Sequence, residues 1–174
     1  MTYTFLKNDF YLSGSMSSKK DYDDTMKILV KNITLQTSTK PSALFTKELE
    51  ALRAKRALTE STVWGGVTLK KVDVAKDYIE KLLIIQQHGV LGFEIHKKKL
   101  EKLKILEGIC LVLFVNHKNH NSRSITIKLA GPGDRFTFHP NDEHGILALS
   151  DCVIQETSTN HLDDLVYIFQ AGQV

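Results

Sequence analysis

The stretch FEIHKKKLEKLKILEG, residues 93–108, carries the strongest structural signal in the chain. Strand alternation places Glu94, His96 and Lys98 on one face and the apolar Phe93 and Ile95 on the other. If the apolar face packs against a neighbouring sheet, the face that carries His96 points into the interior of a barrel. Two kinds of metal-ligating side chain would then meet in one cavity.

The second half of this stretch brings another carboxylate to the same cavity. After a turn, alternation places Glu101, Leu103 and Ile105 on the inward face, while Lys102 and Lys104 point outward. We interpret the lysines of residues 97–104 as a solvated turn and outer face. Imidazoles and carboxylates that converge from different strands are the usual ligands of a divalent transition metal.

From Thr62 onward the sequence is a succession of short β-branched and aromatic runs. Gly, Asn, Asp and Pro separate about ten such runs, which favours a sandwich or barrel over βαβ units. We therefore predict an all-β fold of the jelly-roll barrel type for residues 61–174, with turns at the following positions: Gly89, Gly108, His117 to Ser122, Gly131-Pro132-Gly133 and Pro140-Asn141-Asp142.

Residues 1–60 differ from the rest of the chain in sequence pattern and are predicted to form an N-terminal extension. Met26, Ile28 and Val30 alternate with polar neighbours, and two further apolar residues follow, which predicts a strand. Residues 41–60 carry apolar side chains at near-helical spacing, which predicts an amphipathic helix capped by Ser42. Its apolar face should lie against the body of the protein or against a partner subunit.

The composition of the chain excludes some classes of function. The 174 residues are 42% hydrophobic, and 23 basic against 20 acidic side chains leave a net charge of +3, which is too small for a dedicated nucleic-acid binder. Cys110 and Cys152 lie in apolar runs and are expected to be buried reduced thiols, which fits a cytoplasmic protein. We find no apolar run long enough to cross a membrane and no secretory signal at the N-terminus.

Two motifs resemble those of the cupin superfamily. His96, Glu101 and Gly108 stand as H-x-K-x-x-E-x6-G, close to the first cupin motif. Gly133 and His144 have the separation of the second motif, G-x5-P-x-G-x2-H. Pro140 lies one position late there, and Asn141 replaces the usual Gly, a mild change because Asn tolerates a left-handed turn conformation.

Within the cupins, residues 63–169 are most similar to the phosphomannose-isomerase domain of bifunctional mannose-6-phosphate isomerase/mannose-1-phosphate guanylyltransferases. Trp64-Gly65 resembles an early W-G of that family. FEIHKKKLEKLKILEG resembles its L-Q-x-H-x-H-R-x-E-x-W-x-V-x-x-G, and VIQETSTNHLDDLVYIF resembles its L-I-E-V-Q-T-G…D-D-I-V-R-L. The resemblance implies that Glu94, His96, Glu101 and His144 hold a divalent metal ion: zinc, manganese, iron or nickel.

Three residues depart from the family pattern. Lys98 replaces a histidine ligand, Tyr167 replaces an arginine, and Leu103 replaces a tryptophan. An ammonium group on the ligand face is repelled by a divalent ion. The sequence therefore leaves open a metal-free alternative in which Lys98 pairs with Glu94 and Glu101 in place of the ion.

The resemblance implies a metal-dependent isomerase or epimerase that acts on a sugar or sugar phosphate, similar to mannose-6-phosphate isomerase. Such chemistry needs a base near the metal, and Lys98, His139 and Glu143 are the candidates. Oxygenase chemistry at an iron site is a related possibility. Trp64 is a core or rim aromatic or a platform for the sugar.

The alternative is a non-catalytic cupin that binds a small ligand or serves as a dimeric interaction module. In either case we expect a small-molecule ligand, a homodimer, and neither nucleic acid nor a membrane as partner.

Overall fold

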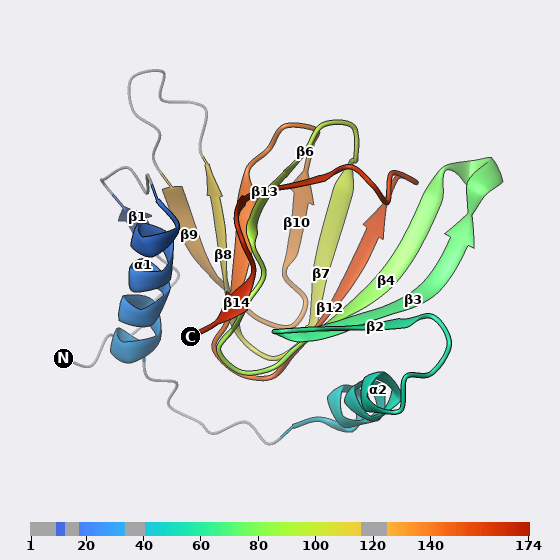
Figure 1. Ribbon diagram of the computed structural model, residues 1–174, viewed down its shortest axis with the longest axis horizontal. Coiled ribbons are helices and arrows are strands. Elements are labelled where there is room, and N and C mark those ends of the chain that lie inside the picture. The colour runs from blue at the N-terminus through green and yellow to red at the C-terminus, as the bar shows by residue number, and fades with distance from the viewer. Residues whose placement is uncertain (1–9, 13–17, 34–40, 116–124) are drawn as a thin grey trace.

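The computed structural model describes residues 10–12, 18–33, 41–115 and 125–174, and in this part of the chain two antiparallel sheets face each other (Figure 1). The first sheet has eight strands. Seven of these strands lie within residues 61–174, where the β fold was predicted. The remaining one, β1, lies in the N-terminal extension. Their bounds are β1 (Phe10–Leu12), β5 (Gly89–Val90), β6 (Phe93–His96), β8 (Cys110–Val115), β9 (Ile125–Ala130), β11 (His144–Ala148), β13 (Leu165–Phe169) and β14 (Gly172–Gln173).

The second sheet has six strands in the order β10-β7-β12-β4-β3-β2. A short 3-10 turn, η1 (Val74–Lys76), joins β3 to β4. The bounds are β2 (Thr59–Thr62), β3 (Gly65–Asp73), β4 (Tyr78–Ile85), β7 (Glu101–Glu107), β10 (Arg135–Phe138) and β12 (Cys152–Ser158). The predicted all-β jelly-roll barrel is confirmed.

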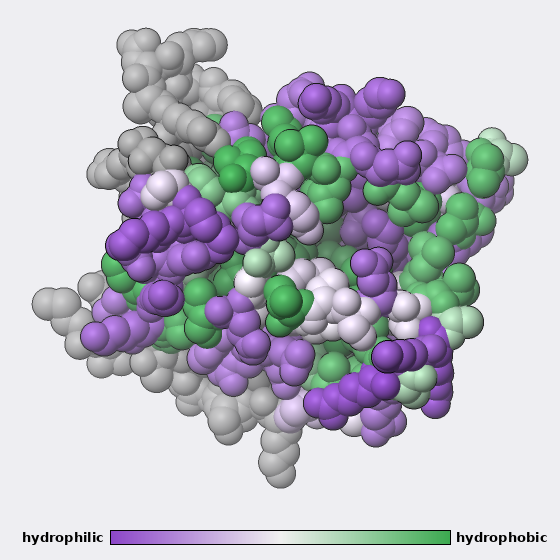
Figure 2. All heavy atoms as spheres, in the orientation of Figure 1, coloured by the Kyte–Doolittle hydropathy of each residue, from purple (hydrophilic) through white to green (hydrophobic). Residues whose placement is uncertain are grey.

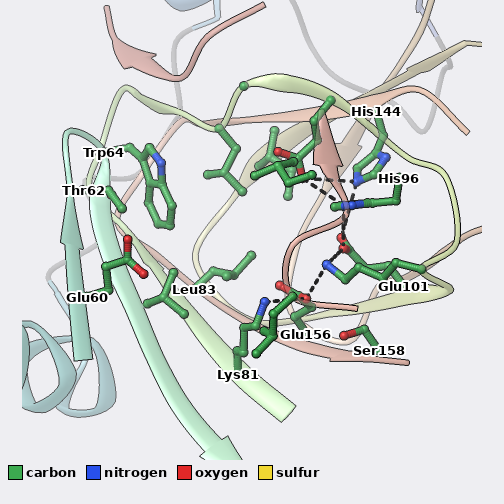
Figure 3. Close-up of a pocket in the computed structure, with 18 of the residues that line it drawn as sticks. Glu60, Thr62, Trp64, Lys81, Leu83, His96, Glu101, His144, Glu156 and Ser158 are labelled. Atoms are coloured by element: carbon green, nitrogen blue, oxygen red, sulfur yellow. Dashed lines mark hydrogen bonds and ion pairs between the residues drawn. The ribbon is translucent and has the colours of Figure 1, made fainter. Parts of the chain in front are cut away.

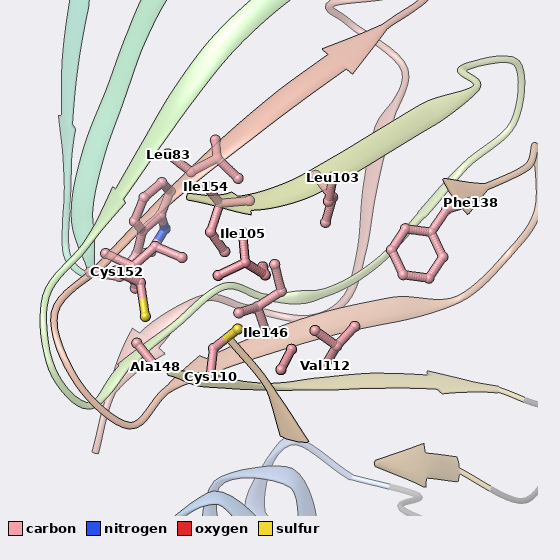
Figure 4. Packing of buried hydrophobic residues seen from close by; sticks show 13 residues of the cluster. Leu83, Leu103, Ile105, Cys110, Val112, Phe138, Ile146, Ala148, Cys152 and Ile154 are labelled. Carbon is pink, nitrogen blue, oxygen red and sulfur yellow. The ribbon is translucent and has the colours of Figure 1, made fainter. Parts of the chain in front are cut away.

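The space between the sheets is filled at one end by apolar side chains (Figure 4). Leu103 and Ile105 of β7 point into this core, whereas Lys102, which precedes them, is exposed and Lys104 between them is half-buried, as alternation predicts. Cys110 and Cys152 are also buried there as free thiols, which confirms the interpretation of the two cysteines. The other end of the barrel is left for polar residues.

Helix α1 (Lys19–Asn32) stands where a strand through Met26, Ile28 and Val30 was predicted, and that prediction is wrong. Ser18 and Asp21 form a capping box at its N-terminus. Tyr22 and Met26, one helical turn apart, are fully buried against the first sheet, whereas Ile28 is 60% exposed. The apolar spacing is helical once Tyr22 is included.

Helix α2 (Ala43–Arg53) confirms an amphipathic helix with its Ser42 cap, but it is shorter than the predicted stretch of residues 41–60, because residues 59 and 60 already belong to β2. The Ser42 hydroxyl accepts a hydrogen bond from the backbone N–H of Phe45 and donates one to Glu107 of β7. Phe45 and Leu52 pack on the outer face of the second sheet. The helix therefore covers the protein's own body, although the division into residues 1–60 and 61–174 stays a prediction.

The predicted turns at Gly108, Gly133 and Asn141 are present, and all three residues have positive φ angles. Asn141, at φ 72°, takes the left-handed conformation expected of the residue that replaces a glycine. The predicted hairpin tip at residues 117–122 lies outside the described residues.

The surface in the view of Figure 2 mixes hydrophilic and hydrophobic residues. Neither of the two described helices is long and apolar enough to cross a membrane.

Candidate metal centre

Four side chains from three strands meet at the polar end of the barrel (Figure 3). Glu94 and His96 lie on β6, and His144 lies on β11, where its backbone pairs with that of Glu94. Glu101 begins β7, in the opposite sheet. One ligand atom from each of the four residues lies within 4.8 Å of the others, which is close enough for one ion to contact all four.

Each imidazole faces the carboxylates through its Nε2 atom. The Nε2 atom of His96 is 3.3 Å from a Glu101 oxygen and 3.5 Å from a Glu94 oxygen. The Nε2 atom of His144 is 3.4 Å from the other Glu101 oxygen and 3.7 Å from Glu94. The glutamate from one sheet therefore lies between two histidines from the other.

The backbone fixes the opposite side of each imidazole ring. Nδ1 of His96 lies 3.2 Å from the carbonyl oxygen of Asp164, and Nδ1 of His144 lies 3.2 Å from that of Asp142. A carbonyl oxygen can only accept, so Nδ1 carries the proton and Nε2 is left as the ligating atom. The ring of Phe138 also stacks on His144 at a centroid distance of 4.0 Å.

Both Nε2 atoms are buried, and apart from the ion-pair contacts with Glu94 and Glu101 they have no hydrogen-bond partner among the described residues. Buried polar atoms without a partner are rare because each one costs free energy. A divalent ion between the two Nε2 atoms and the two carboxylates would satisfy them at once. The two imidazoles, whose Nδ1 atoms contact backbone carbonyls, and the two carboxylates form a ligand set that fits zinc, manganese, iron or nickel.

The electrostatics of the cluster compensate for its burial. Burial alone would lower the pKa of His96, but the carboxylates of Glu101 and Glu94 outweigh it and raise the pKa to about 9. The pKa of His144 is raised in the same way, chiefly by Glu101. Burial would raise the pKa of Glu101, yet the imidazoles and Lys99 hold it well below its usual range.

The lysine that reaches this cluster is Lys99, and the prediction that Lys98 shares the ligand face is wrong. The carboxylate of Asp164 accepts hydrogen bonds from the backbone N–H groups of Lys98 and Lys99, at 2.5 and 2.9 Å, and so holds a bend after β6. The bend ends the strand alternation at His96. The Lys98 side chain is exposed, whereas that of Lys99 is buried.

Lys99 joins the metal cluster to a second group of charges. Its Nζ atom donates to Glu101 and lies 2.7 Å from Glu156. Glu156 of β12 is in turn 3.3 Å from Nζ of Lys81, its neighbour on β4. This cluster of Lys81, Lys99 and Glu156, which we call the lysine relay, was not predicted, because it depends on the pairing of strands far apart in the sequence.

The cluster and the lysine relay form one end of a cavity with a volume of about 630 Å³. Its other walls come mainly from β2, β3, β4 and the segment before β13. They are lined by Leu58, Thr59, Glu60, Thr62, Trp64, Val67, Leu69, Leu83, Leu91, Gly92, Gly145, Ile146, Ser158, His161, Leu162, Leu165 and Tyr167. Trp64 therefore belongs both to the core and to the wall of the cavity.

The three predicted bases do not line the cavity. Lys98 points to solvent, and the His139 side chain is 71% exposed beside Asp142. Glu143 is half-buried in the turn before His144 and is also absent from the cavity wall. Of the titratable residues in the wall, Glu60, His161 and Tyr167 belong to neither the metal cluster nor the lysine relay.

No protein-family model and no curated protein matches this sequence. Several solved structures are similar to this chain in fold. An oxalate decarboxylase variant from Bacillus subtilis is 16% identical with a TM-score of 0.55, and it covers 66% of this chain and 31% of its own. A formate complex of the Lactobacillus farciminis oxalate decarboxylase is 16% identical with a TM-score of 0.54, over 66% and 34%.

The structure of KdgF from Halomonas sp. is 17% identical with a TM-score of 0.47, over 57% of this chain and 81% of that one. This chain spans about a third of the length of the oxalate decarboxylases it matches. At these identities the likeness concerns the fold alone. The chain has the cupin jelly-roll fold.

Proposed function

We propose that this cupin-fold protein is a divalent-metal-dependent enzyme, with Glu94, His96, Glu101 and His144 as the metal ligands. The observation that carries the proposal is the pair of buried Nε2 atoms, which face two carboxylates and have no other partner among the described residues. A bound ion would polarise a carbonyl or hydroxyl oxygen of a small molecule in the cavity.

The reaction class that we propose is isomerisation or epimerisation of a compound with adjacent carbonyl and hydroxyl groups, as in a sugar. This class needs a side chain that accepts a proton from one carbon and returns it to another or to the other face. We propose Glu60 for this role. It is an exposed residue of β2 whose carboxylate faces the interior beside Trp64, across the cavity from the metal cluster, in Figure 3, and its side chain forms no hydrogen bond or ion pair among the described residues.

A metal-free binding protein is the second candidate, and Lys99 is the observation that favours it. Its ammonium group lies between Glu101 and Glu156, so part of the buried negative charge is compensated without an ion. Lys99 forms its ion pairs with Glu101 and Glu156, and no hydrogen bond joins it to either Nε2 atom among the described residues, so the lysine does not take the place of an ion at the two imidazoles.

Metal content separates the two candidates. The protein is purified without a metal-binding tag, exposed to zinc, manganese, iron or nickel, and analysed by plasma mass spectrometry. We expect about one ion per chain, which His96→Ala and His144→Ala lose. His139→Ala, which alters an exposed histidine outside the cluster, should retain the ion. Wild-type protein that binds none of the four ions would leave the metal-free candidate.

Proton abstraction is then measured directly. Metal-loaded protein is incubated with mannose, fructose or mannose 6-phosphate in D2O, and loss of the proton beside the carbonyl is followed by NMR. Glu60→Gln should slow the exchange by at least about 100-fold while it retains the metal. Equal exchange in wild type and Glu60→Gln would remove Glu60 from this role.

A further inference from the structure

The cavity of about 630 Å³ has two chemically different ends. The metal cluster and the lysine relay form one end, and the opposite wall is formed by Trp64, Val67 and Leu83, with Leu69 beside them. In Figure 3, Trp64 and Leu83 lie across the cavity from His96 and Glu101. A ligand held by the metal would therefore extend toward an apolar wall.

Apolar side chains on both sides of the cavity are also open to solvent: Leu58 lies beside this wall, whereas Leu165 pairs with His96 and Leu162 precedes it. Leu58 is 64% exposed, Leu162 is 55% exposed and Leu165 is 39% exposed, and all three line the cavity. Large apolar side chains that cluster around one opening, instead of being scattered singly, are typical of a site that binds an apolar group.

The charges in the wall argue against an anionic group at this end. Both lysines of the cavity are paired, Lys81 with Glu156 and Lys99 with Glu101 and Glu156. Glu60 lies on the apolar side without a cationic partner among the described residues. A phosphate or carboxylate there would meet a like charge and no compensating lysine.

A hydroxyl group points to hydrogen bonding on the polar side. Ser158 lines the cavity next to the lysine relay, its side chain is 7% exposed, and its hydroxyl has no hydrogen-bond partner in the described structure. A ligand with several oxygens near the metal would satisfy this hydroxyl.

From these features we infer that the site selects a substrate whose oxygens bind at the metal end and whose far end is an uncharged apolar group, not a phosphate. The inference rests on the proposed metal site and narrows its substrate class. It sets aside sugar phosphates in favour of small oxygen-rich compounds that carry an aliphatic or aromatic substituent.

Three catechols test this selection, because they share two adjacent metal-binding oxygens and differ in one substituent. Catechol, 4-tert-butylcatechol and 3,4-dihydroxybenzoate are titrated calorimetrically, without oxygen, into the zinc-loaded full chain, and its zinc content is measured afterwards. We expect 4-tert-butylcatechol to bind at least tenfold more tightly than catechol, and 3,4-dihydroxybenzoate to bind more weakly than catechol.

Two variants test whether the apolar wall causes the tighter binding of 4-tert-butylcatechol. Leu58→Glu places a charge at the exposed edge of the wall, where the Leu58 carbonyl pairs with the Leu69 N–H, and should reduce the tert-butyl advantage at least fivefold. Val74→Glu changes a side chain that is 74% exposed outside the cavity and should leave the advantage unchanged.

Two failures are distinguishable. If the chain holds zinc but the carboxylate binds as well as the tert-butyl group, the inference is overturned and the proposed metal site stands. If wild type holds no zinc, the metal site fails and the inference fails with it.

Discussion

The ammonium group of Lys99 touches two buried carboxylates, those of Glu101 and Glu156, and its side chain is 7% exposed. Glu156 retains Lys81 as a second partner at 3.3 Å, whereas Glu101 has no other lysine within 4 Å in the described structure. Lys99 therefore holds the carboxylate of Glu101 in place between the two histidines.

Lys99→Met should destabilise the metal-free protein by about 3 kcal/mol, because it leaves buried carboxylates without their cation. Lys98→Met changes an exposed neighbour and should alter the free energy of unfolding by less than about 0.5 kcal/mol. Chemical denaturation in the presence of a chelator measures both values. Equal losses in the two variants would show that Lys99 does not pair inside the barrel.

Metal binding at this site should release protons. A pKa of about 9 means that His96 carries its second proton at pH 7 in the metal-free protein, and an ion at Nε2 must displace that proton. Zinc should therefore release at least one proton per ion at pH 7, and its affinity should increase as the pH rises toward 9. Calorimetry in buffers of different ionisation enthalpy measures this release.

The same pKa gives the pH dependence of the metal-free fold. The folded-state pKa of His96 lies above the ordinary value of 6.5, so protonation of this residue stabilises the fold fully below about pH 6.5. That contribution is lost as the pH rises through about 9. Zinc binding without proton release, together with pH-independent stability of the chelated protein over this range, would contradict the ion pairs around His96.

At the scale of single elements, α1 shows where sequence reasoning failed and why. Alternation from Met26 to Val30 fits a strand, but a window of five residues cannot distinguish a strand from one side of a helix. Tyr22, one turn before Met26, supplies the missing period. Its ring stacks on Phe169 at 5.1 Å and its hydroxyl donates to the Leu91 carbonyl at 3.2 Å.

Tyr22→Ala should destabilise the protein by about 3–5 kcal/mol, because it opens a cavity under α1. Tyr22→Phe removes only the hydrogen bond and should cost about 1 kcal/mol. Ile28→Ala, on the exposed side of the same helix, should change stability by less than about 0.5 kcal/mol. Thermal and chemical unfolding measure the series, and a cost at Ile28 as large as at Tyr22 would favour the predicted strand.

The turn before β11 is the opposite case, because its backbone conformation was predicted correctly from the sequence. Asn141 was expected in a left-handed conformation because of its place in the second motif, and it has a φ of 72°. Its backbone N–H donates to the carbonyl of His96 at 2.6 Å, so this turn ties β6 to the segment that precedes His144. Motif spacing succeeds here because the turn geometry is local.

At the scale of the whole molecule, the four predicted ligands come together although Glu101 belongs to one sheet and the other three to the opposite sheet. Their convergence follows from motifs with fixed spacing. The lysine relay could not be predicted in this way, because Lys81 and Glu156 lie 75 positions apart and meet only through the pairing of β4 with β12.

An ion shared by both sheets should stabilise the entire fold. With zinc at about 100 times its Kd, linkage predicts a gain of about 2.7 kcal/mol, or an increase in Tm of about 5–10 °C for a chain of this size. Scanning calorimetry with zinc and with a chelator measures the shift. His144→Ala should show no zinc-dependent shift, and a shift that persists in this variant would place the ion elsewhere.

Trp64 is the single tryptophan of the 174 residues, and it forms part of the cavity wall. The protein therefore carries its own optical reporter at one defined place. Tryptophan emission arises from this indole alone, so its colour and intensity report on the polarity of the cavity without an attached label. Occupancy of the site can then be followed in real time, and dry and water-filled forms of the cavity can be distinguished in solution.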